Sequence, residues 1–278
     1  GGCTIPVFTG PAYYCIVNRL DFSTETLSLP GKNLSIKRRK LSGTFNSNYG
    51  YFAGGEISTP PAPTIYSTID RIDFSNETVS APGNNLTQAR YNLAAVSNSN
   101  YGYFGGGDAP PFVCTIDRLD FSNESISVPP AGNQLTQARA ALAAVSSSNY
   151  GYFAGGFAPP YVCTIDRLDF SNETVSEPSS ELTQTRGYLA TVSNSDYGYF
   201  AGGNPVVCTI DRLDFSSETV SEPSSELTQA RYGLAAVSNS DYGYFAGGII
   251  PPYVCTIDRL DFSSETVSEP SSELTQAR

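Results

Sequence analysis

The sequence is a tandem array of one short unit, and this repetition constrains the fold more than any other feature. The string Tyr-Gly-Tyr-Phe begins at five positions, at intervals of 52, 49, 47 and 45 residues: Tyr49, Tyr101, Tyr150, Tyr197 and Tyr242. A second string, Arg-Leu/Ile-Asp-Phe, begins at Arg19, Arg71, Arg118, Arg167, Arg212 and Arg259. Residues 208–231 and 255–278 are identical, so the later copies are the least diverged.

Each unit is predicted to form four short strands. In one copy the four runs are Leu93–Ser97, Tyr101–Phe104, Thr115–Phe121 and Glu124–Val128. Runs of four to seven residues separated by turn residues are typical of hairpins. No segment keeps a 3.6-residue period, so we expect an all-β protein. A unit of 45–52 residues with four antiparallel strands indicates a β-propeller blade.

The order of the motifs resembles the kelch repeat over essentially the whole chain. A small-apolar strand is followed by Tyr-Phe-Ala-Gly-Gly and then by Ile-Asp-Arg-Leu-Asp-Phe, and kelch units carry a double glycine after the second strand. The fourth strand differs, because kelch units usually carry Trp there; this chain has Val79, Ile126, Val175, Val220 and Val267. The segment 100–107 also resembles repeats in structural proteins of marine phages and large viruses, such as tail fibres and other appendages.

The resemblance implies a kelch-like β-propeller, a single domain over residues 1–278 with about six four-stranded blades. The units are about 1–55, 56–107, 108–156, 157–203, 204–248 and, in part, 249–278. Six copies of the third-and-fourth-strand hairpin occur, but only five of the first-and-second-strand hairpin. We therefore expect a six-bladed ring with an incomplete seam blade, in a chain that is part of something larger. The alternative is an open array that continues into a fibre.

Composition excludes several kinds of chemistry. The chain contains no His, Met or Trp, so Ser-His-Asp and Cys-His relays and His-ligated metals are excluded. Its 16 Lys+Arg and 27 Asp+Glu give a net charge of −11, which disfavours nucleic-acid binding. The basic cluster Lys37–Lys40 is interpreted as local charge balance or an assembly contact. No apolar run is long enough to insert into a membrane, and no signal peptide is visible.

The connections between second and third strands differ most among the copies. By kelch analogy they lie on one face with the connections from fourth to first strands, and variable loops on a rigid scaffold are where binding sites accumulate. They are rich in Pro and in aromatic residues, which provide contact area at low entropic cost. The candidate ligand-binding residues in them are Tyr13, Tyr14, Phe112, Tyr161 and Tyr253. The alternative, which we favour, is that the Pro-Pro-aromatic motif packs one blade onto the next.

One arginine precedes each expected innermost strand. These residues are Arg90, Arg139, Arg186 and Arg231. In a ring they would encircle the channel mouth and bind an anion or an acidic glycan. The favoured alternative is that each pairs with an Asp of the third strand, such as Asp117 or Asp120. Arg118 and Asp120 share one strand face by alternation, which predicts a polar ladder between blades.

Glycine and alanine pairs have structural explanations. Ala94-Ala95 fits crowded strands near the axis, and Gly155-Gly156 fits a bend that needs positive φ or close backbone approach. Neither resembles a phosphate-binding loop, and no cofactor is expected.

Five of the six cysteines begin the third strand. They are Cys15, Cys114, Cys163, Cys208 and Cys255, with Ser67 in the remaining copy. Positions related by sixfold rotation lie too far apart for a disulfide, so these residues are predicted to be small buried thiols. Cys3 with Cys15 is the one pair that we consider possible.

Sequons of the type Asn-x-Ser/Thr offer two interpretations. They occur at Asn33, Asn76, Asn85, Asn123 and Asn172. In a secreted eukaryotic protein they would carry glycans. In a phage protein they would only favour tight turns, and Ser217 and Ser264 at equivalent positions favour this second interpretation slightly.

Two classes of function remain. The first is a non-enzymatic binding or structural module of a virion appendage or extracellular fibre, whose variable-loop face contacts a host glycan or neighbouring protein subunits. A secreted, N-glycosylated adhesion or matrix protein is the alternative. The second class, a carboxylate-dependent glycan hydrolase, is disfavoured because the acidic residues recur in every unit and no blade carries an acidic insertion.

Overall fold

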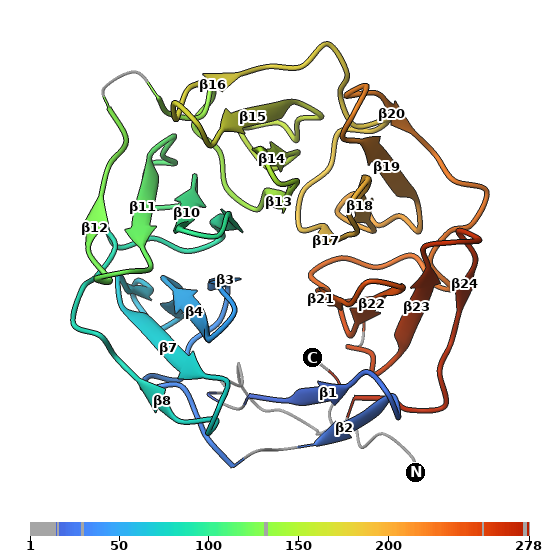
Figure 1. Cartoon of the computed structure of the whole chain (residues 1–278), viewed down its shortest axis with the longest axis horizontal. Helices are drawn as coiled ribbons and strands as arrows, with labels where there is room; N and C mark the ends of the chain where they lie inside the picture. Colours follow the sequence, from blue (N-terminus) through green and yellow to red (C-terminus); the bar gives the residue numbers. More distant parts are fainter. Residues whose placement is uncertain are drawn as a thin grey trace.

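The computed structural model of the chain is an all-β ring of repeated sheets around a central axis (Figure 1). The structure describes Cys15 and residues 17–28, 31–130, 133–251, 253–274 and 277. Within these ranges every regular element is a strand, as the sequence predicted.

Five sheets of four antiparallel strands form the blades, which we number 1 to 5 along the chain. Blade 1 contains β3 (Ser42–Phe45), β4 (Tyr49–Ala53), β7 (Ile69–Asp73) and β8 (Val79–Ser80). Blade 2 contains β9 (Ala94–Ser97), β10 (Tyr101–Gly105), β11 (Ile116–Asp120) and β12 (Ile126–Ser127), and blade 3 contains β13 (Ala143–Ser146), β14 (Tyr150–Ala154), β15 (Ile165–Asp169) and β16 (Val175–Ser176). Blade 4 contains β17 (Ala190–Ser193), β18 (Tyr197–Ala201), β19 (Ile210–Asp214) and β20 (Val220–Ser221), and blade 5 contains β21 (Ala235–Ser238), β22 (Tyr242–Ala246), β23 (Ile257–Asp261) and β24 (Val267–Ser268).

Two further sheets have two strands each. In blade 1, β5 (Glu56–Ile57) pairs with β6 (Thr64–Ile65) in the connection between β4 and β7. Between blades 5 and 1, β1 (Arg19–Asp21) pairs with β2 (Thr26–Ser28), and we call this part of the ring the sixth sector (Figure 1). Arg19 lies opposite Ser28 in the sixth sector as Arg71 lies opposite Ser80 in blade 1. The β1–β2 pair therefore corresponds to the third and fourth strands of a blade.

The described residues form five four-stranded blades, one fewer than the expected count of about six. The propeller arrangement itself and the order of four strands within a blade are confirmed. Each sheet takes its first two strands from one sequence unit and its last two from the next, so the blade boundary is shifted by half a unit.

A close packing contact between blades explains the Tyr-Gly-Tyr motif. A Cβ atom on Gly151 would lie 2.6 Å from a methyl carbon of Val96 in the preceding blade, and one on Gly198 would lie 2.6 Å from Val145. Only glycine lets the inner strand of one blade approach the second strand of the next so closely. The buried tyrosine that follows each of these glycines belongs to the hydrophobic core between blades.

The same tyrosines stack on phenylalanines of the following blade. The ring of Tyr103 lies 5.4 Å from that of Phe170, and the ring of Tyr199 lies 5.4 Å from that of Phe262. At these offset-stacked distances an aromatic pair contributes about 0.5–1.5 kcal/mol beyond the area it buries.

An ion pair joins each blade to the next. The third-strand arginine of one blade binds a glutamate in the turn between the third and fourth strands of its neighbour, at 2.6–2.9 Å. The six pairs are Arg19–Glu77, Arg71–Glu124, Arg118–Glu173, Arg167–Glu218, Arg212–Glu265 and Arg259–Glu25. Together they run around the whole ring, with the sixth sector linked on both sides. The predicted polar ladder thus exists, but its acid is this turn glutamate and not Asp120.

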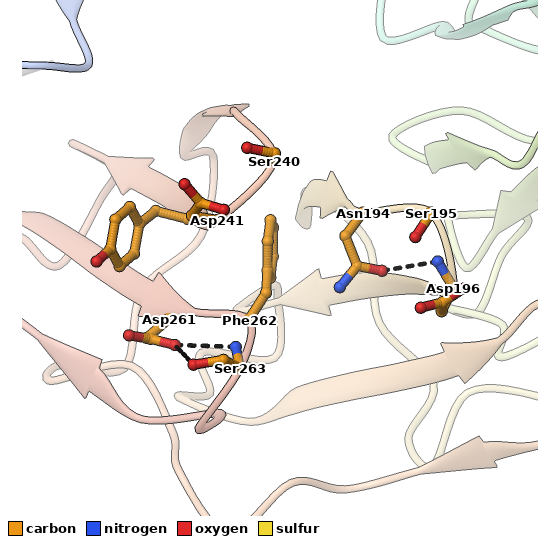
Figure 2. Close-up of a pocket in the computed structure, with 9 residues that line it drawn as sticks. Asn194, Ser195, Asp196, Ser240, Asp241, Asp261, Phe262 and Ser263 are labelled. Carbon is orange, nitrogen blue, oxygen red and sulfur yellow. Dashed lines mark hydrogen bonds between the residues drawn. The ribbon is translucent and has the colours of Figure 1, made fainter.

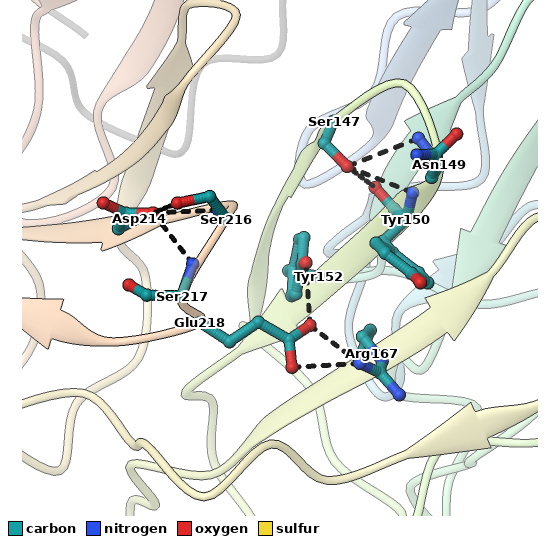
Figure 3. A network of polar contacts seen from close by, with 9 residues as sticks. All are labelled: Ser147, Asn149, Tyr150, Tyr152, Arg167, Asp214, Ser216, Ser217 and Glu218. Carbon is teal, nitrogen blue, oxygen red and sulfur yellow. Dashed lines mark hydrogen bonds and ion pairs between the residues drawn. The ribbon is translucent and has the colours of Figure 1, made fainter.

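Each glutamate has an unusual backbone conformation, and, among the described residues, all except Glu77 accept a hydrogen bond from a second donor, a tyrosine hydroxyl. All six have positive φ, between 53° and 60°, a region that non-glycine residues rarely adopt. Glu218 accepts hydrogen bonds from the Tyr152 hydroxyl at 3.0 Å and from Arg167 at 2.9 Å (Figure 3). The guanidinium of Arg167 in turn lies 4.8 Å from the centre of the Tyr150 ring.

We expect the substitution Glu218→Asn to lower the free energy of unfolding by about 1–2 kcal/mol, because Asn tolerates positive φ but removes the acceptor that Arg167 and Tyr152 share. Ser217→Asn, which copies the residue of an earlier unit, is the matched control and should leave stability unchanged. Urea unfolding of the three proteins measures this. Equal stability of Glu218→Asn and the parent chain would contradict a structural role for the link.

The turn before each of these glutamates contains an aspartate with a perturbed pKa. Hydrogen bonds from Ser171 hold the pKa of Asp169 below its usual value, although partial burial opposes them, and the equivalent aspartates behave alike. A carboxylate with a lowered pKa stabilises the fold above its unfolded-state pKa of about 3.9, and this stabilisation is lost as the pH falls through the folded-state value.

We therefore expect the free energy of unfolding to decrease as the pH falls from about 5 to below 3. In an NMR titration, Ser171→Ala should raise the pKa of Asp169 towards its usual value, whereas Ser224→Ala, in another exposed loop, should not. An unchanged Asp169 titration in Ser171→Ala would show that the hydroxyl does not stabilise the carboxylate.

Candidate binding surface at the channel mouth

The arginines proposed as anion ligands do not line the channel mouth. Their side chains are fully buried, and each forms an ion pair of 2.8–3.0 Å with the third-strand aspartate of its own blade. The pairs are Arg90–Asp117, Arg139–Asp166, Arg186–Asp211 and Arg231–Asp258, with Arg38–Asp70 in blade 1. The interpretation as ligand-binding residues therefore requires correction, and the structural pairing favoured above is what the molecule contains.

These buried pairs attach the connection that precedes the first strand to the rest of the blade. Arg186 donates hydrogen bonds to the backbone carbonyls of Gly202, Thr209 and Phe200 as well as to Asp211. Burial lowers the pKa of Arg186 and the charge of Asp211 opposes this shift, so the guanidinium remains charged near neutral pH. The connection that follows each arginine is consequently rigid.

Removing one member of such a pair leaves an uncompensated buried charge. We expect Arg186→Met to lower the free energy of unfolding by about 3–5 kcal/mol. The double variant Arg186→Met/Asp211→Leu should be more stable than Arg186→Met alone, because it removes the orphaned carboxylate as well. Denaturant unfolding of both variants tests this; a double variant less stable than Arg186→Met would contradict the charge argument.

A chain of backbone hydrogen bonds follows directly after the arginines and surrounds the channel mouth. In blades 2 to 5 the residue two positions after the arginine donates its backbone amide to the carbonyl of the equivalent residue in the preceding blade, at 2.7–2.8 Å. The order of these residues around the ring is Lys40, Asn92, Ala141, Tyr188 and Gly233. In each blade the residue immediately after the arginine also pairs with the first residue after the double glycine. These two contacts bring both sets of variable connections together on one face, as expected.

Tyr188 is an aromatic residue at a position that has positive φ in every blade. Its φ is 58°, where a bulky side chain is strained, and the equivalent residues Lys40, Asn92, Ala141 and Gly233 have φ between 55° and 68°. The side chain of Asn92, two blades away around the ring, is close enough to lower the pKa of Tyr188, against the larger effect of burial. Its ring meets that of Tyr232 at 6.1 Å. Burial raises its pKa, with contributions from Tyr161 and Asp108, so the hydroxyl is neutral and able to donate.

Further polar and aromatic side chains surround Tyr188. The Tyr91 hydroxyl donates to Asp108 at 2.6 Å, and the Asn204 amide donates to the Tyr161 hydroxyl at 2.7 Å. We define Tyr91, Asn92, Asp108, Tyr161, Tyr188, Asn204 and Tyr232 as the mouth cluster. All seven side chains are partly exposed, so they combine aromatic surface with amide and carboxylate groups in one place.

Two cations at the edge of the mouth cluster share one carboxylate. Glu56 is buried and forms ion pairs with Arg39 at 3.0 Å and Lys40 at 2.8 Å. The Lys40 ammonium also lies 4.8 Å from the centre of the Tyr91 ring. Three of the four residues of the basic cluster, Arg38, Arg39 and Lys40, thus form local ion pairs, which agrees with its interpretation as local charge balance.

The predicted aromatic site residues have different positions. Phe112 contacts Phe157 of the next blade at 5.8 Å, and Phe157 contacts Tyr161 at 4.9 Å, so these rings join neighbouring blades while staying partly exposed. Tyr253 is exposed. Tyr13 and Tyr14 lie outside the described residues.

The opposite face carries open cavities between blades. One of about 410 Å³ is lined by Asn194, Asp196, Asp241, Phe262 and neighbouring serines (Figure 2), and one of about 420 Å³ lies between blades 1 and 2. Much of the polar lining is already engaged, since Asn194 accepts the backbone amides of Asp196 and Tyr197. Because these cavities repeat with the blades, we regard them as grooves of the architecture and the mouth cluster as the stronger candidate.

The disulfide considered possible between Cys3 and Cys15 does not form, because Cys15 is a free thiol; Cys3 lies outside the described residues. Cys114, Cys163 and Cys208 are also free, as expected, but they are partly exposed and not buried, whereas Cys255 is disulfide-bonded. The buried thiol predicted at Cys255 was therefore incorrect, and nothing in the repeat pattern distinguishes this cysteine from its equivalents.

The sequons lie on exposed residues, and those at the repeated turn cap it. The side-chain carbonyl of Asn76 accepts a hydrogen bond from the backbone amide of Thr78, and that of Asn172 accepts one from the backbone amide of Thr174, both at an N···O distance of 2.9 Å. The turn-forming role is therefore present, and glycosylation stays a prediction.

Comparisons with known proteins leave the chain without an assigned family. No protein-family model matches the sequence, and no curated protein matches it either. Among the described residues there is no group of three or more Cys, Asp or Glu side chains placed to hold a metal ion. No helix in the described part is long and apolar enough to cross a membrane.

Sequence reasoning missed most of the mouth cluster. Tyr188, Asn92 and Asp108 sit next to strongly repeated motifs, directly after the arginine or the double glycine. The available signal was divergence: the residues after the arginine read Tyr-Asn, Ala-Ala, Gly-Tyr and Tyr-Gly in successive copies.

Proposed function

We propose that the protein is a non-enzymatic binding module with a divergent kelch-like propeller, and that its variable-loop face contacts a surface glycan or neighbouring protein subunits in a virion appendage or extracellular fibre. The observation that carries the proposal is the mouth cluster. It breaks the repeat, it is held by rigid backbone, and it includes a strained tyrosine.

Strain in a residue that the fold does not require is informative. The backbone is left-handed at this position in every blade, and glycine, which blade 5 has there, would be free of strain; Tyr188 is the aromatic residue among the non-glycine copies. Because a bulky residue at positive φ costs about 1–3 kcal/mol, its presence favours a role in binding.

The chemistry of the cluster favours a neutral glycan over an acidic one. Tyrosine rings offer apolar faces to the C–H surface of a sugar ring, while Asp108 and the amides of Asn92 and Asn204 can exchange hydrogen bonds with hydroxyl groups. The buried arginines are already paired, and Arg39 and Lys40 share the single carboxylate of Glu56. Asp108 places a negative charge in the cluster itself, which disfavours a negatively charged ligand there.

Two alternatives keep specific support. The exposed sequons suit a secreted, N-glycosylated adhesion or matrix protein. A carboxylate-dependent glycan hydrolase would have to use Asp108 or Glu56, which accept hydrogen bonds from Tyr91 and Arg39. We disfavour this second alternative because both carboxylates are already engaged, Asp108 with the Tyr91 hydroxyl and Glu56 with Arg39 and Lys40.

We expect immobilised neutral oligosaccharides on a glycan array to retain the protein, and Tyr188→Gly to weaken this binding at least about tenfold while the chain stays folded. Asp196→Asn, on the opposite face, is the matched control and should bind as the parent does. If Asp196→Asn loses binding and Tyr188→Gly keeps it, the variable-loop face is not the contact surface. A structure of the assembled particle would test the subunit-contact version directly.

A further inference from the structure

Among the described residues, the sixth sector lacks the first and second strands that every complete blade has. In blades 1 to 5 the third strand pairs with a second strand on one side and a fourth strand on the other. β1 pairs with β2 alone among the described residues. Its other edge therefore presents backbone donors and acceptors of the kind that an added strand can use.

An uncovered valine on blade 5 marks one wall of this site. Val96, Val145 and Val192 are buried against a glycine of the following blade, where a Cβ atom would lie at 2.5–2.6 Å. Their equivalent Val237 is 50% exposed, and Ala235 beside it is exposed too. β21 is thus an inner strand with the shape to receive a second strand that has glycine at this point.

An uncovered phenylalanine on blade 1 marks the other wall. Phe121, Phe170 and Phe215 each stack on a tyrosine of the preceding blade at 5.3–5.6 Å. Their equivalent Phe74 is 49% exposed. The position lacks only the tyrosine that would come from the second strand of the sixth sector.

The ion pair at this boundary shows the same incompleteness. The Arg19 side chain is 57% exposed, whereas its five equivalents are 29–31% exposed and lie over a tyrosine ring at 4.6–4.9 Å. The equivalents of Glu77 also accept a tyrosine hydroxyl at 2.9–3.1 Å. Exposed residues of β1, of β21 and of blade 1 are thus each complementary to the same motif, Tyr-Gly-Tyr.

We propose that the sixth sector is a docking site for a β-hairpin of the repeat's own first-and-second-strand sequence, supplied by polypeptide other than residues 1–278. The second strand of that hairpin adds to β1, its glycine receives Val237, and its two tyrosines cover Arg19 and Phe74. The first strand of the hairpin fills the inner ring between β21 and β3. A second copy of this chain is disfavoured as the donor, because its five such hairpins are already part of blades. This site is separate from the mouth cluster and does not depend on the function proposed for it.

The test uses a labelled peptide with the sequence of residues 234–248 and the full chain, with binding followed by fluorescence anisotropy. We expect saturable 1:1 binding. The matched control peptide carries Gly243→Val and should not bind, because the added side chain occupies the space of Val237. In the chain, Val237→Ser and Phe74→Ser should each weaken binding about tenfold or more. Val128→Ser and Val206→Ser change valines that are 44% exposed at other places and should bind like the parent.

Equal binding of the two peptides, or equal binding by the Val237→Ser and Val128→Ser chains, would overturn the proposal. So would self-association of the chain in analytical ultracentrifugation that Val237→Ser abolishes, because the occupant would then be a second copy.

If the free peptide is insoluble, the same hairpin can be tested as a covalent extension of the chain. A copy of residues 232–248 is appended after Arg278, where the repeat order places it. The appended chain should melt at a higher temperature than the parent, and Val237→Ser should lower its Tm although the same change leaves the parent unaffected. An unchanged Tm on appending the hairpin would also overturn the proposal.

Discussion

The contact on which the ring depends is the ion pair that one blade makes with the turn of the next. An arginine of the third strand can reach the neighbouring glutamate only because that glutamate adopts positive φ and directs its carboxylate back across the interface. The carboxylate also accepts a tyrosine hydroxyl, so one acid joins two residues of the preceding blade. Since all six pairs exist, the interaction that orders each interface also links β1–β2 into the ring.

The remaining interblade contacts follow from the spacing that this link sets. With the blades held this close, the second strand has room only for glycine opposite the inner valine, and the tyrosine beside it is forced onto the next phenylalanine. The buried Arg–Asp pairs then attach the loops to the blades from inside. A rigid scaffold of this kind lets a few loop residues diverge without loss of the fold, and the mouth cluster is where they diverge most.

Repetition and its interruption therefore have different roles in this molecule. Where the copies agree, as in Tyr-Gly-Tyr-Phe, the residues pack blades together. Where they disagree, as at Tyr188 and Asp108, side chains of four blades gather on one face of the ring. Where the pattern is interrupted, in the sixth sector, hydrophobic surface that is buried elsewhere faces solvent at Phe74 and Val237.

The sequence by itself determined the strand pattern and the all-β propeller, and it favoured pairing of the arginines with third-strand aspartates, because each of these depends on periodicity and on residue types repeated in every unit. It did not determine the number of complete blades, since the sequence of β1–β2 matches the last two strands of a blade whether or not two further strands pair with it. The disulfide of Cys255, the glutamate link and the mouth cluster were decided only by tertiary structure. The glutamate link and the mouth cluster join residues from different blades, and in a repeat every copy offers the same local signal, so only the arrangement in space selects which copies meet.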